Sequence, residues 1–445
     1  MSVRTRDPVR DSSIPAVGVR RSGLRIRVAI VVSGAVLLVE ASWWWGRGLQ
    51  GDGTRLFLNA PPLTGHLDPR FPARALGAVA VAGIIVWLGP LLAQRAGWRR
   101  LLLVAVAGAA LWAAALAAAD GVAGFLIGPS SRLGYLHDVP LVGSPGAFLS
   151  GFVDRIGMYS AHVRAHPPGM VLLLWSLDRL GLSGPGWVAA LEILGGAAAV
   201  PAASIAVREV AGEAAARRAV PFLVLAPAAV TLAASGDALF TGVAAWAIAL
   251  VVLATGRTGR TSDGLAWVGG VLFGATLFLS YGLVLLSLLP LAVAIGRRRF
   301  RPLAAAAVGI AAVVGAFGAA GFWWGAGLLA ARREYLASVA RFRPYGYFLV
   351  ADLAAFAVIL GPAAIAGLVR LRHRATWLLV GGALVAVALA DVSGMSKGEV
   401  ERIWLPFAPW VLLAAAALPE RTGRAWLAAT AVAALALQLL VVSPW

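Results

Sequence analysis

Long apolar runs separated by short polar segments dominate the chain. A run of roughly 20 apolar residues is long enough to cross a bilayer as a helix, and shorter ones can do so with flanking residues. We expect thirteen such spans, at residues 25–44, 73–94, 101–119, 187–207, 218–234, 238–255, 264–280, 283–296, 302–325, 347–369, 376–391, 403–418 and 425–443. The pattern predicts an all-α polytopic membrane protein.

Composition supports this class and removes others. Of the 445 residues, 60% are hydrophobic and 13% charged, which is more apolar than a soluble domain can bury. The net charge of +18 would suit a nucleic-acid partner, but 37 of the 38 basic residues are arginines, most of them clustered between apolar runs. Such clusters are typical of loops that set orientation beside anionic lipids, so no nucleic-acid partner is expected. The absence of cysteine excludes disulfides and thiolate chemistry.

The amino-terminal segment differs from the remainder. Residues 1–24 are polar and arginine-rich, and no cleavable signal peptide is evident. We expect this segment to be a cytoplasmic tail, with 25–445 forming one integral domain in the plasma membrane.

The apolar run at 167–182 decides the orientation of everything after it. If it crosses the membrane, the arginine clusters at 256–260, 297–301 and 370–374 all lie outside. If it is a surface helix, 24 basic residues lie inside and 14 outside, as the positive-inside rule favours. We therefore expect a helix that does not span.

This orientation predicts four external segments. They are 45–72, 120–186, 326–346 and 391–402, and the second is a long first external loop that contains surface helices. All six tyrosines and eleven of the twenty acidic residues fall in or beside external segments, so any chemistry is expected on the outer face.

Two aspartates of the long external loop are candidate catalytic groups. Asp120 ends an apolar run, where an acid is either functional or simply a solvated helix end. Asp138 follows His137 in a loop, where a carboxylate is either catalytic or a turn former.

The stretch "HVRAHPPG", 162–169, precedes the surface run. Two prolines suit the first turn of a helix and fix its direction, which holds His166 at the helix mouth, with His162 four residues earlier. A metal site lacks an assigned third ligand. Hydrogen bonding to a phosphate or a sugar hydroxyl fits better, and an interfacial cap is the alternative.

Two further segments carry polar residues at the ends of apolar runs. "SGDALF", 235–240, places Asp237 at the outer start of a span, and "LFLSYGL", 277–283, places Tyr281 in a break between two runs. Irregular backbone at this depth is tolerated where it lines protein or a cavity. Both segments border one pocket or are simple turns.

The external segment 332–348 spaces arginines among tyrosines. Arg341 and Arg343 lie beside Tyr345, and the planar guanidinium suits phosphate. Recognition of a lipid phosphate or headgroup competes here with a plain interfacial belt.

"SGMSKGEVERIWLPFAPW", 393–410, is the most specific element. It holds the only lysine, Lys397, with Glu399, Glu401 and Arg402 directly before a span. In a chain that otherwise uses arginine, this group is better explained by a functional site than by orientation.

The order of these motifs resembles that of a known superfamily. The long first external loop with carboxylates, "HPPG", "SGDALF" and "GEVERIWLPF" resemble the GT-C superfamily of integral-membrane glycosyltransferases, from about Asp120 onward. More narrowly, the pattern is similar to the actinobacterial group that includes the methylthioxylose transferase of mycobacterial lipoarabinomannan.

The resemblance implies a bundle of about 13 helices and a specific chemistry. The donor would be a polyprenyl-phosphate sugar, and the acceptor an envelope glycan or glycolipid on the extracytoplasmic face. Transfer would invert the anomeric centre, with Asp138 or Asp120 as general base; the family's adjacent acidic pair is missing here.

Charge stabilisation would then come from the cations singled out above. The candidate donor-phosphate ligands are Arg402, Lys397, Arg343, Arg341 and His166. The candidate substrate ligands are Glu399, Glu401, His162, Asp237, Tyr281 and Tyr345. No nucleotide-sugar site is expected, because the chain has no glycine-rich phosphate loop. No residues are assigned to a metal, and a requirement for a divalent cation stays open.

Two other classes compete with a transferase. A lipid or glycan transporter or flippase predicts inverted repeats and mid-membrane charges. No repeat is clear, and few charges, such as Glu192 and Asp352, lie within spans. A non-catalytic scaffold would not need clustered external carboxylates and cations.

Overall fold

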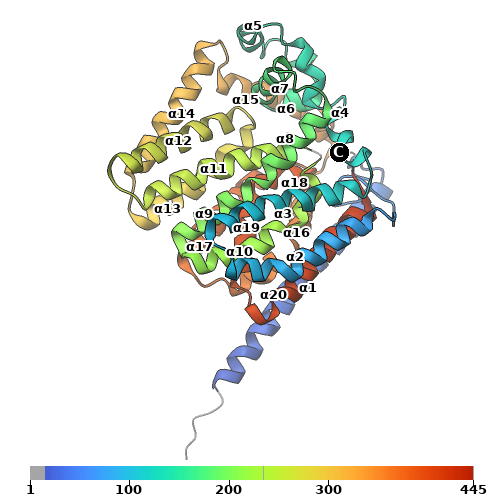
Figure 1. Ribbon diagram of the computed structural model, residues 1–445. Coiled ribbons are helices and arrows are strands. Elements are labelled where there is room, and N and C mark those ends of the chain that lie inside the picture. The colour runs from blue at the N-terminus through green and yellow to red at the C-terminus, as the bar shows by residue number, and fades with distance from the viewer. Residues whose placement is uncertain (1–15, 234, 444–445) are drawn as a thin grey trace, which may run out of the picture.

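A computed structural model describes residues 16–233 and 235–443 (Figure 1). Within these residues nine helical segments are long and apolar enough to cross a membrane, which confirms a polytopic all-α protein. They are α2 (Ala75–Arg95), α3 (Trp98–Ala118), the joined α8 and α9 (Pro185–Ala197 and Ala199–Ala211), α11 (Asp237–Thr255), α14 (Arg301–Ala319), α16 (Tyr345–Arg370), α17 (Arg374–Val392), the segment Val400–Ala417 and α20 (Glu420–Leu440).

Four of the thirteen expected spans fall on other helical segments. Those at 25–44 and 264–280 lie largely in α1 (Ala16–Gly51) and α12 (Gly259–Leu277). The one at 218–234 is divided between α10 (Glu213–Val224) and η3 (Pro227–Thr231), and the one at 283–296 between η4 (Tyr281–Ser287) and α13 (Leu288–Arg297). The total of thirteen spans stays a prediction.

The first helix is longer than the run that predicted it. It has 36 residues, about 54 Å at 1.5 Å per residue, against an apolar bilayer core of about 30 Å. It begins at Ala16 rather than at residue 25, because the polar stretch before the apolar run is also helical. The expected tail therefore merges into α1, and its residues 1–15 lie outside the described residues.

The expected external loop 120–186 folds into short helices that gather at one end of the bundle (Figure 1). They are α4 (Ala123–Ser130), η1 (Tyr135–Leu141), α5 (Pro145–Ser150), η2 (Ile156–Met158), α6 (Ala161–Ala165) and α7 (Gly169–Arg179). At 11 residues, α7 is about 16 Å long, roughly half the thickness of the apolar core. A length of this kind suits a surface helix, whose side of the membrane stays a prediction.

The same end of the bundle carries the other functional candidates. Here lie α15 (Trp324–Ala337) and η5 (Val339–Phe342), and α6 is tied to α15 by the Arg164–Glu334 ion pair, 3.2 Å. The segment Val400–Ala417 is broken into α18 (Val400–Ile403), η6 (Leu405–Phe407), α19 (Ala408–Leu412) and η7 (Leu413–Ala417). Its irregular backbone is tolerated because protein surrounds it, with 89% of the segment buried.

A short antiparallel strand pair joins the segment before α2 to the end of the described chain. In β1 (His66–Leu67) and β2 (Val441–Val442), His66 is opposite Val442. This pairing holds the segment after α1 against the end of α20.

Glycines set the closest helix crossings. A Cβ on Gly242 of α11 would overlap the carbonyl oxygen of Gly195 in α8, and one on Gly270 of α12 would overlap that of Ala306 in α14. Small residues let helices approach closely where lipid provides no hydrophobic drive for association. The α8–α11 crossing lies just inside the end of the bundle that carries the polar residues.

Candidate functional site

Arg402 is the centre of a buried polar cluster at the end of the bundle that carries the short helices. Its Nη1 donates to Asp237 Oδ2 at 2.9 Å, and its Nη2 donates to Glu399 Oε2 at 2.6 Å and to His162 Nε2 at 3.3 Å. Arg402 and Asp237 are only 5% and 4% exposed. Ser235 Oγ donates to the same Asp237 oxygen at 2.6 Å. Charges so deeply buried are tolerated only when paired in this way.

Local structure brings these groups together. Asp237 is the first residue of α11, where the positive end of the helix dipole favours a carboxylate. Glu399 has a left-handed φ of 63° and precedes α18, so its side chain and that of Arg402 meet three residues apart. His162 comes from α6, in the folded loop that covers this end.

His162 is a neutral hydrogen-bond acceptor. Because the Arg402 guanidinium donates to Nε2, the ring proton lies on Nδ1. Burial, followed by the positive charge of Arg402, lowers the pKa of His162 to about 3. The imidazole is therefore uncharged at neutral pH.

The "HPPG" element docks against the break between α12 and η4. Gly169 N–H donates to Phe278 O at 2.9 Å, and His166 Nδ1 lies 3.3 Å from Leu279 O, to which it donates. The ring of His166 packs 5.8 Å from that of Tyr135. Burial lowers the pKa of His166, so this ring is also neutral. The element thus fixes the start of α7 and builds an aromatic wall beside the cluster.

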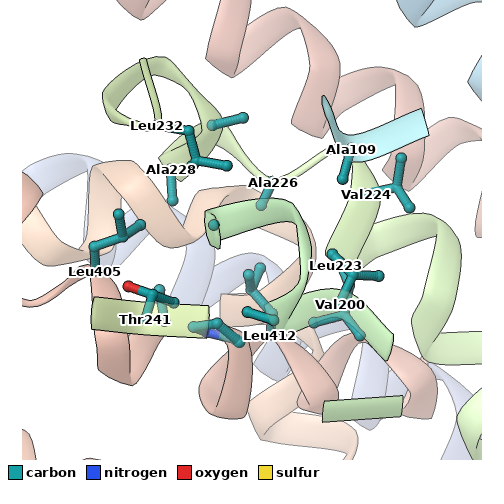
Figure 2. Close-up of a pocket in the computed structure, with 15 residues that line it drawn as sticks. Ala109, Val200, Leu223, Val224, Ala226, Ala228, Leu232, Thr241, Leu405 and Leu412 are labelled. Carbon is teal, nitrogen blue, oxygen red and sulfur yellow. The ribbon is translucent and has the colours of Figure 1, made fainter. Parts of the chain in front are cut away.

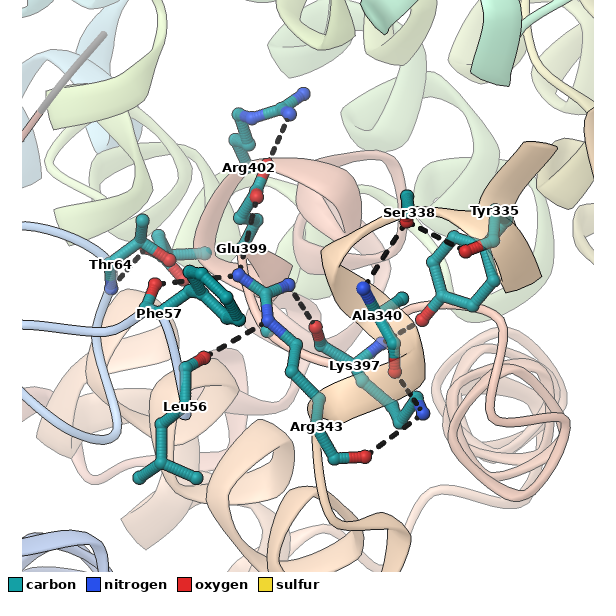
Figure 3. Close-up of polar contacts among 12 residues, drawn as sticks. Leu56, Phe57, Thr64, Tyr335, Ser338, Ala340, Arg343, Lys397, Glu399 and Arg402 are labelled. Carbon is teal, nitrogen blue, oxygen red and sulfur yellow. Dashed lines mark hydrogen bonds and ion pairs between the residues drawn. The ribbon is translucent and has the colours of Figure 1, made fainter. Parts of the chain in front are cut away.

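A second cluster, around Arg343 and Lys397, adjoins the first (Figure 3). Arg343 Nε donates to Leu56 O at 3.1 Å, its Nη1 donates to Lys397 O, and its Nη2 lies 3.7 Å from Glu399 Oε1. Lys397 Nζ donates to Ala340 O at 2.6 Å and to Arg343 O at 3.0 Å. These bonds tie the segment after α1 to the 393–399 turn.

Glu399 joins the two clusters. Figure 3 shows its carboxylate between the guanidinium groups of Arg402 and Arg343. Burial acts to raise the pKa of Glu399, but the two guanidinium charges outweigh it and lower the pKa below its usual value. An anion is therefore stable in this position.

A polar pocket opens beside the Arg402 cluster. Its polar walls are Tyr135, His162, Glu192 and Ser235, supplied by η1, α6, α8 and the turn before α11. Glu192 is 3% exposed, and its Oε2 has no hydrogen-bond partner among the described residues. The pocket can therefore offer an acceptor to a ligand.

A separate apolar cavity lies deeper in the bundle (Figure 2). Leu223, Leu232 and Leu412 are among its lining residues. Thr241 and Leu405 also line it, about one turn along from Asp237 and Arg402.

The two aspartates proposed as general bases hold other contacts. Asp120 accepts from Arg70 Nη1 at 2.7 Å and from Gln438 Nε2 at 2.8 Å. Asp138 accepts from Ser160 N–H at 2.7 Å, and its other oxygen lies 3.1 Å from His137 Nδ1. Neither forms a hydrogen bond or ion pair with Arg402, so the structure does not bring them into the cluster.

Four other predicted site residues also lie apart. Glu401 accepts a hydrogen bond from Thr64 N–H at 2.8 Å, and the Tyr345 hydroxyl donates to Val392 O at 2.7 Å. Arg341 is exposed and lies over the ring of Phe342. The ring of Tyr281 packs 5.4 Å from that of Trp324. The structure joins Arg402, Glu399, Asp237, His162, Arg343, Lys397 and His166, directly or through one neighbour.

Sequence reasoning did not assign Tyr135, Ser235 or Glu192 to the site. Glu192 had a usable signal, because it is the one acid in the apolar run 187–207. Tyr135 and Ser235 lie within motifs that were noted for other residues. Among residues 16–233 and 235–443, no group of three or more His, Asp or Glu side chains is arranged to hold a metal ion.

In comparisons with known proteins, no family model, no curated protein and no solved structure matched the chain. The fold and the apolar helices define a multi-pass membrane protein with a buried Arg–carboxylate cluster at one end of its helices. The resemblance to the GT-C superfamily stays a prediction from the order of the sequence motifs.

Proposed function

We propose that the protein is an inverting glycosyltransferase that uses a polyprenyl-phosphate-linked sugar. The acceptor is an envelope glycan or glycolipid, of lipoarabinomannan type by the resemblance, and transfer occurs on the extracytoplasmic face of the plasma membrane. The observation that carries the proposal is Glu399 held between Arg402 and Arg343, beside a polar pocket.

The two arginines supply what a departing phosphate needs. As the anomeric carbon–oxygen bond breaks, negative charge grows on the phosphate, and fixed cations nearby stabilise it. An arginine guanidinium binds phosphate and carboxylate in the same way, through two parallel hydrogen bonds from its planar group. A donor phosphate can therefore take over contacts that Glu399 makes here, while Asp237 keeps Arg402 in position.

The apolar cavity beside the cluster is too small for the chain of a lipid-linked donor. It begins about one helical turn inward from Asp237 and Arg402 and is lined almost entirely by aliphatic side chains (Figure 2). Its volume of about 40 Å³ leaves no room for a hydrocarbon chain, so the prenyl chain of a lipid-linked donor would lie in the surrounding bilayer. Membrane lipids are then the natural surroundings of the donor.

Inversion requires a base on the face of the sugar opposite the phosphate. The resemblance assigns this role to Asp138 or Asp120. Each of these two carboxylates already has two polar partners in the structure. The pocket beside Arg402 offers a different carboxylate, considered below.

Transfer from radiolabelled polyprenyl-phosphate sugars in membranes that contain the protein tests the proposal. We expect label to enter a membrane glycan or glycolipid, and Arg402→Met to lower the rate about 100-fold or more. Arg301→Met, which removes an exposed cation from the Asp263 ion pair, is the matched control. Absence of transfer from every donor tested, or full activity of Arg402→Met, would contradict the proposal. Movement of intact donor across the membrane without transfer would instead favour a flippase.

A further inference from the structure

Glu192 is a buried carboxylate within an apolar helix. It lies seven residues after Pro185, the first residue of α8, about 10 Å along the helix axis. An ionisable side chain at such a position is costly unless it is paired or serves a function. Its Oε2 is buried and has no hydrogen-bond partner among the described residues.

A second glutamate of the same helical segment shows the contrast. Glu209, near the end of α9, lies 3.1 Å from both Arg257 and Arg297. That carboxylate is neutralised by Arg257 of the α11–α12 loop and by Arg297 at the end of α13. Glu192 faces the polar pocket instead, beside Tyr135, His162 and Ser235.

The close α8–α11 crossing places Glu192 near the Arg402 cluster. Gly195, one turn after Glu192, lies directly against Gly242 and Leu239 of α11. A larger residue at Gly195 would separate the two helices, and with them Glu192 from Ser235 and Asp237 at the start of α11.

Tyr135 lies between Glu192 in the pocket and His162 of the Arg402 cluster. Burial raises the pKa of its hydroxyl well above the usual value, and the charges of Asp237 and Glu192 act in the same direction, while Arg402 opposes them. The Tyr135 ring lines the pocket with Glu192 and lies 5.7 Å from the ring of His162, which Arg402 contacts. The space between the pocket walls holds about one water molecule. It suits a single hydroxyl group rather than a whole sugar ring.

We propose that Glu192 receives the proton of the acceptor hydroxyl, with Tyr135 and Ser235 lining the subsite for that hydroxyl. This assignment rests on the proposed function and names a base other than the loop aspartates. The acceptor oxygen forms a bond to the anomeric carbon, and its proton passes to the Glu192 carboxylate. The bond from that carbon to the phosphate oxygen breaks, and its electron pair leaves with the polyprenyl phosphate beside Arg402. Water in the pocket then takes the proton from Glu192.

The test compares transfer and donor binding in membranes, using a radiolabelled polyprenyl-phosphate sugar. We expect Glu192→Gln to lower kcat at least 100-fold, as for loss of a general base, while donor binding changes less than twofold. Asp391→Asn is the matched control, because Asp391 is also buried with an unpartnered oxygen but lies outside the pocket. It should keep activity within about twofold of wild type.

A pH profile separates a base from a structural residue. The titratable groups around Glu192 are Tyr135 and His162, which line the same pocket, and Asp237, whose charge acts on Glu192. Wild-type kcat/KM should rise with pH through one proton step, and the residual rate of Glu192→Gln should lack that step.

The outcomes distinguish the two proposals. Activity of Glu192→Gln within threefold of wild type, or loss confined to Asp138→Asn or Asp120→Asn, would overturn the assignment and leave the transferase intact. A lost rate with an unchanged pH profile would also overturn it. A wild-type protein that transfers no sugar would overturn the proposed function, and the assignment with it.

Discussion

Arg402 and Asp237 form a buried ion pair, 2.9 Å between Nη1 and Oδ2, although 165 positions separate them in the sequence. Each belongs to a different apolar segment, α18 and α11, and each is nearly inaccessible. The pair therefore links two segments of the bundle at the end that holds the candidate site.

Removal of one partner should destabilise the protein strongly. Asp237→Ala leaves Arg402 buried with fewer acceptors, so we expect the free energy of unfolding to fall by about 3–5 kcal/mol. The double variant Asp237→Leu/Arg402→Met should recover part of this loss, because no charge then stays buried. Denaturant titration of the purified protein in detergent measures both.

The matched control for this pair is Asp263→Ala. It breaks the largely exposed Asp263–Arg301 pair and should cost less than about 1 kcal/mol. Equal losses for Asp237→Ala and Asp263→Ala would show that the buried pair does not link the segments as described.

The pKa of His162 predicts a dependence of stability on pH. Its folded value of about 3 lies below the ordinary value of 6.5, so the unfolded chain binds the proton first as pH falls. The free energy of unfolding should therefore decrease from about pH 6.5 towards pH 3, and burial of His166 acts in the same direction. Melting temperatures at pH 7.5 and pH 5 should differ less in His162→Gln than in wild type. The exposed His66→Gln should keep the wild-type difference; an identical difference in all three proteins would refute this account.

Gly169 is predicted to tolerate no side chain. A Cβ there would overlap Phe278 O, the acceptor of the Gly169 N–H bond. Gly169→Ala should thus lower stability by about 1–3 kcal/mol, as overpacking does. Gly186→Ala, in a helical position with open space around it, should stay within about 1 kcal/mol of wild type. If Gly169→Ala behaved like that control, the docking of "HPPG" on the 278–280 break would be wrong.

The orientation of the bundle can be read by cysteine labelling, because the chain has no cysteine of its own. With α7 on the outer surface, Ser183→Cys should react with a membrane-impermeant maleimide on intact cells. Arg299→Cys, in the exposed turn between α13 and α14, should react only after permeabilisation. The opposite pattern would place this end of the bundle, with α7 and the candidate site, on the cytoplasmic side.

Hydropathy predicted the helices of the bundle as far as the length of each apolar run determines them. Nine of the thirteen expected runs form helices of suitable length and character. The run at 218–234 could not be resolved this way, because its helix ends before Pro227 inside a run that hydropathy alone reads as continuous. The break between the runs at 264–280 and 283–296 was expected, although α12 ends three residues before its run does.

Individual members of the cluster were predictable, but their association was not. Asp237, Glu399, Arg402 and His162 each stood out as polar residues beside apolar runs. Their contacts depend on the rotation of α11 and α18 and on the fold of the loop that carries α6, none of which periodicity specifies. Glu192 was visible as a charge in a span, yet its pocket is formed by residues from four segments.

The Asp237–Arg402 pair also constrains how the protein is made. Asp237 leaves the ribosome 165 residues before its partner, roughly ten to thirty seconds earlier at about 5–20 residues per second. During that interval α11 carries an acid that its final counter-ion cannot yet neutralise. Neutralisation of Asp237 by Arg402 therefore waits for the last part of the chain. A translation product that stops before Arg402 is left with an uncompensated carboxylate that quality-control proteases can recognise.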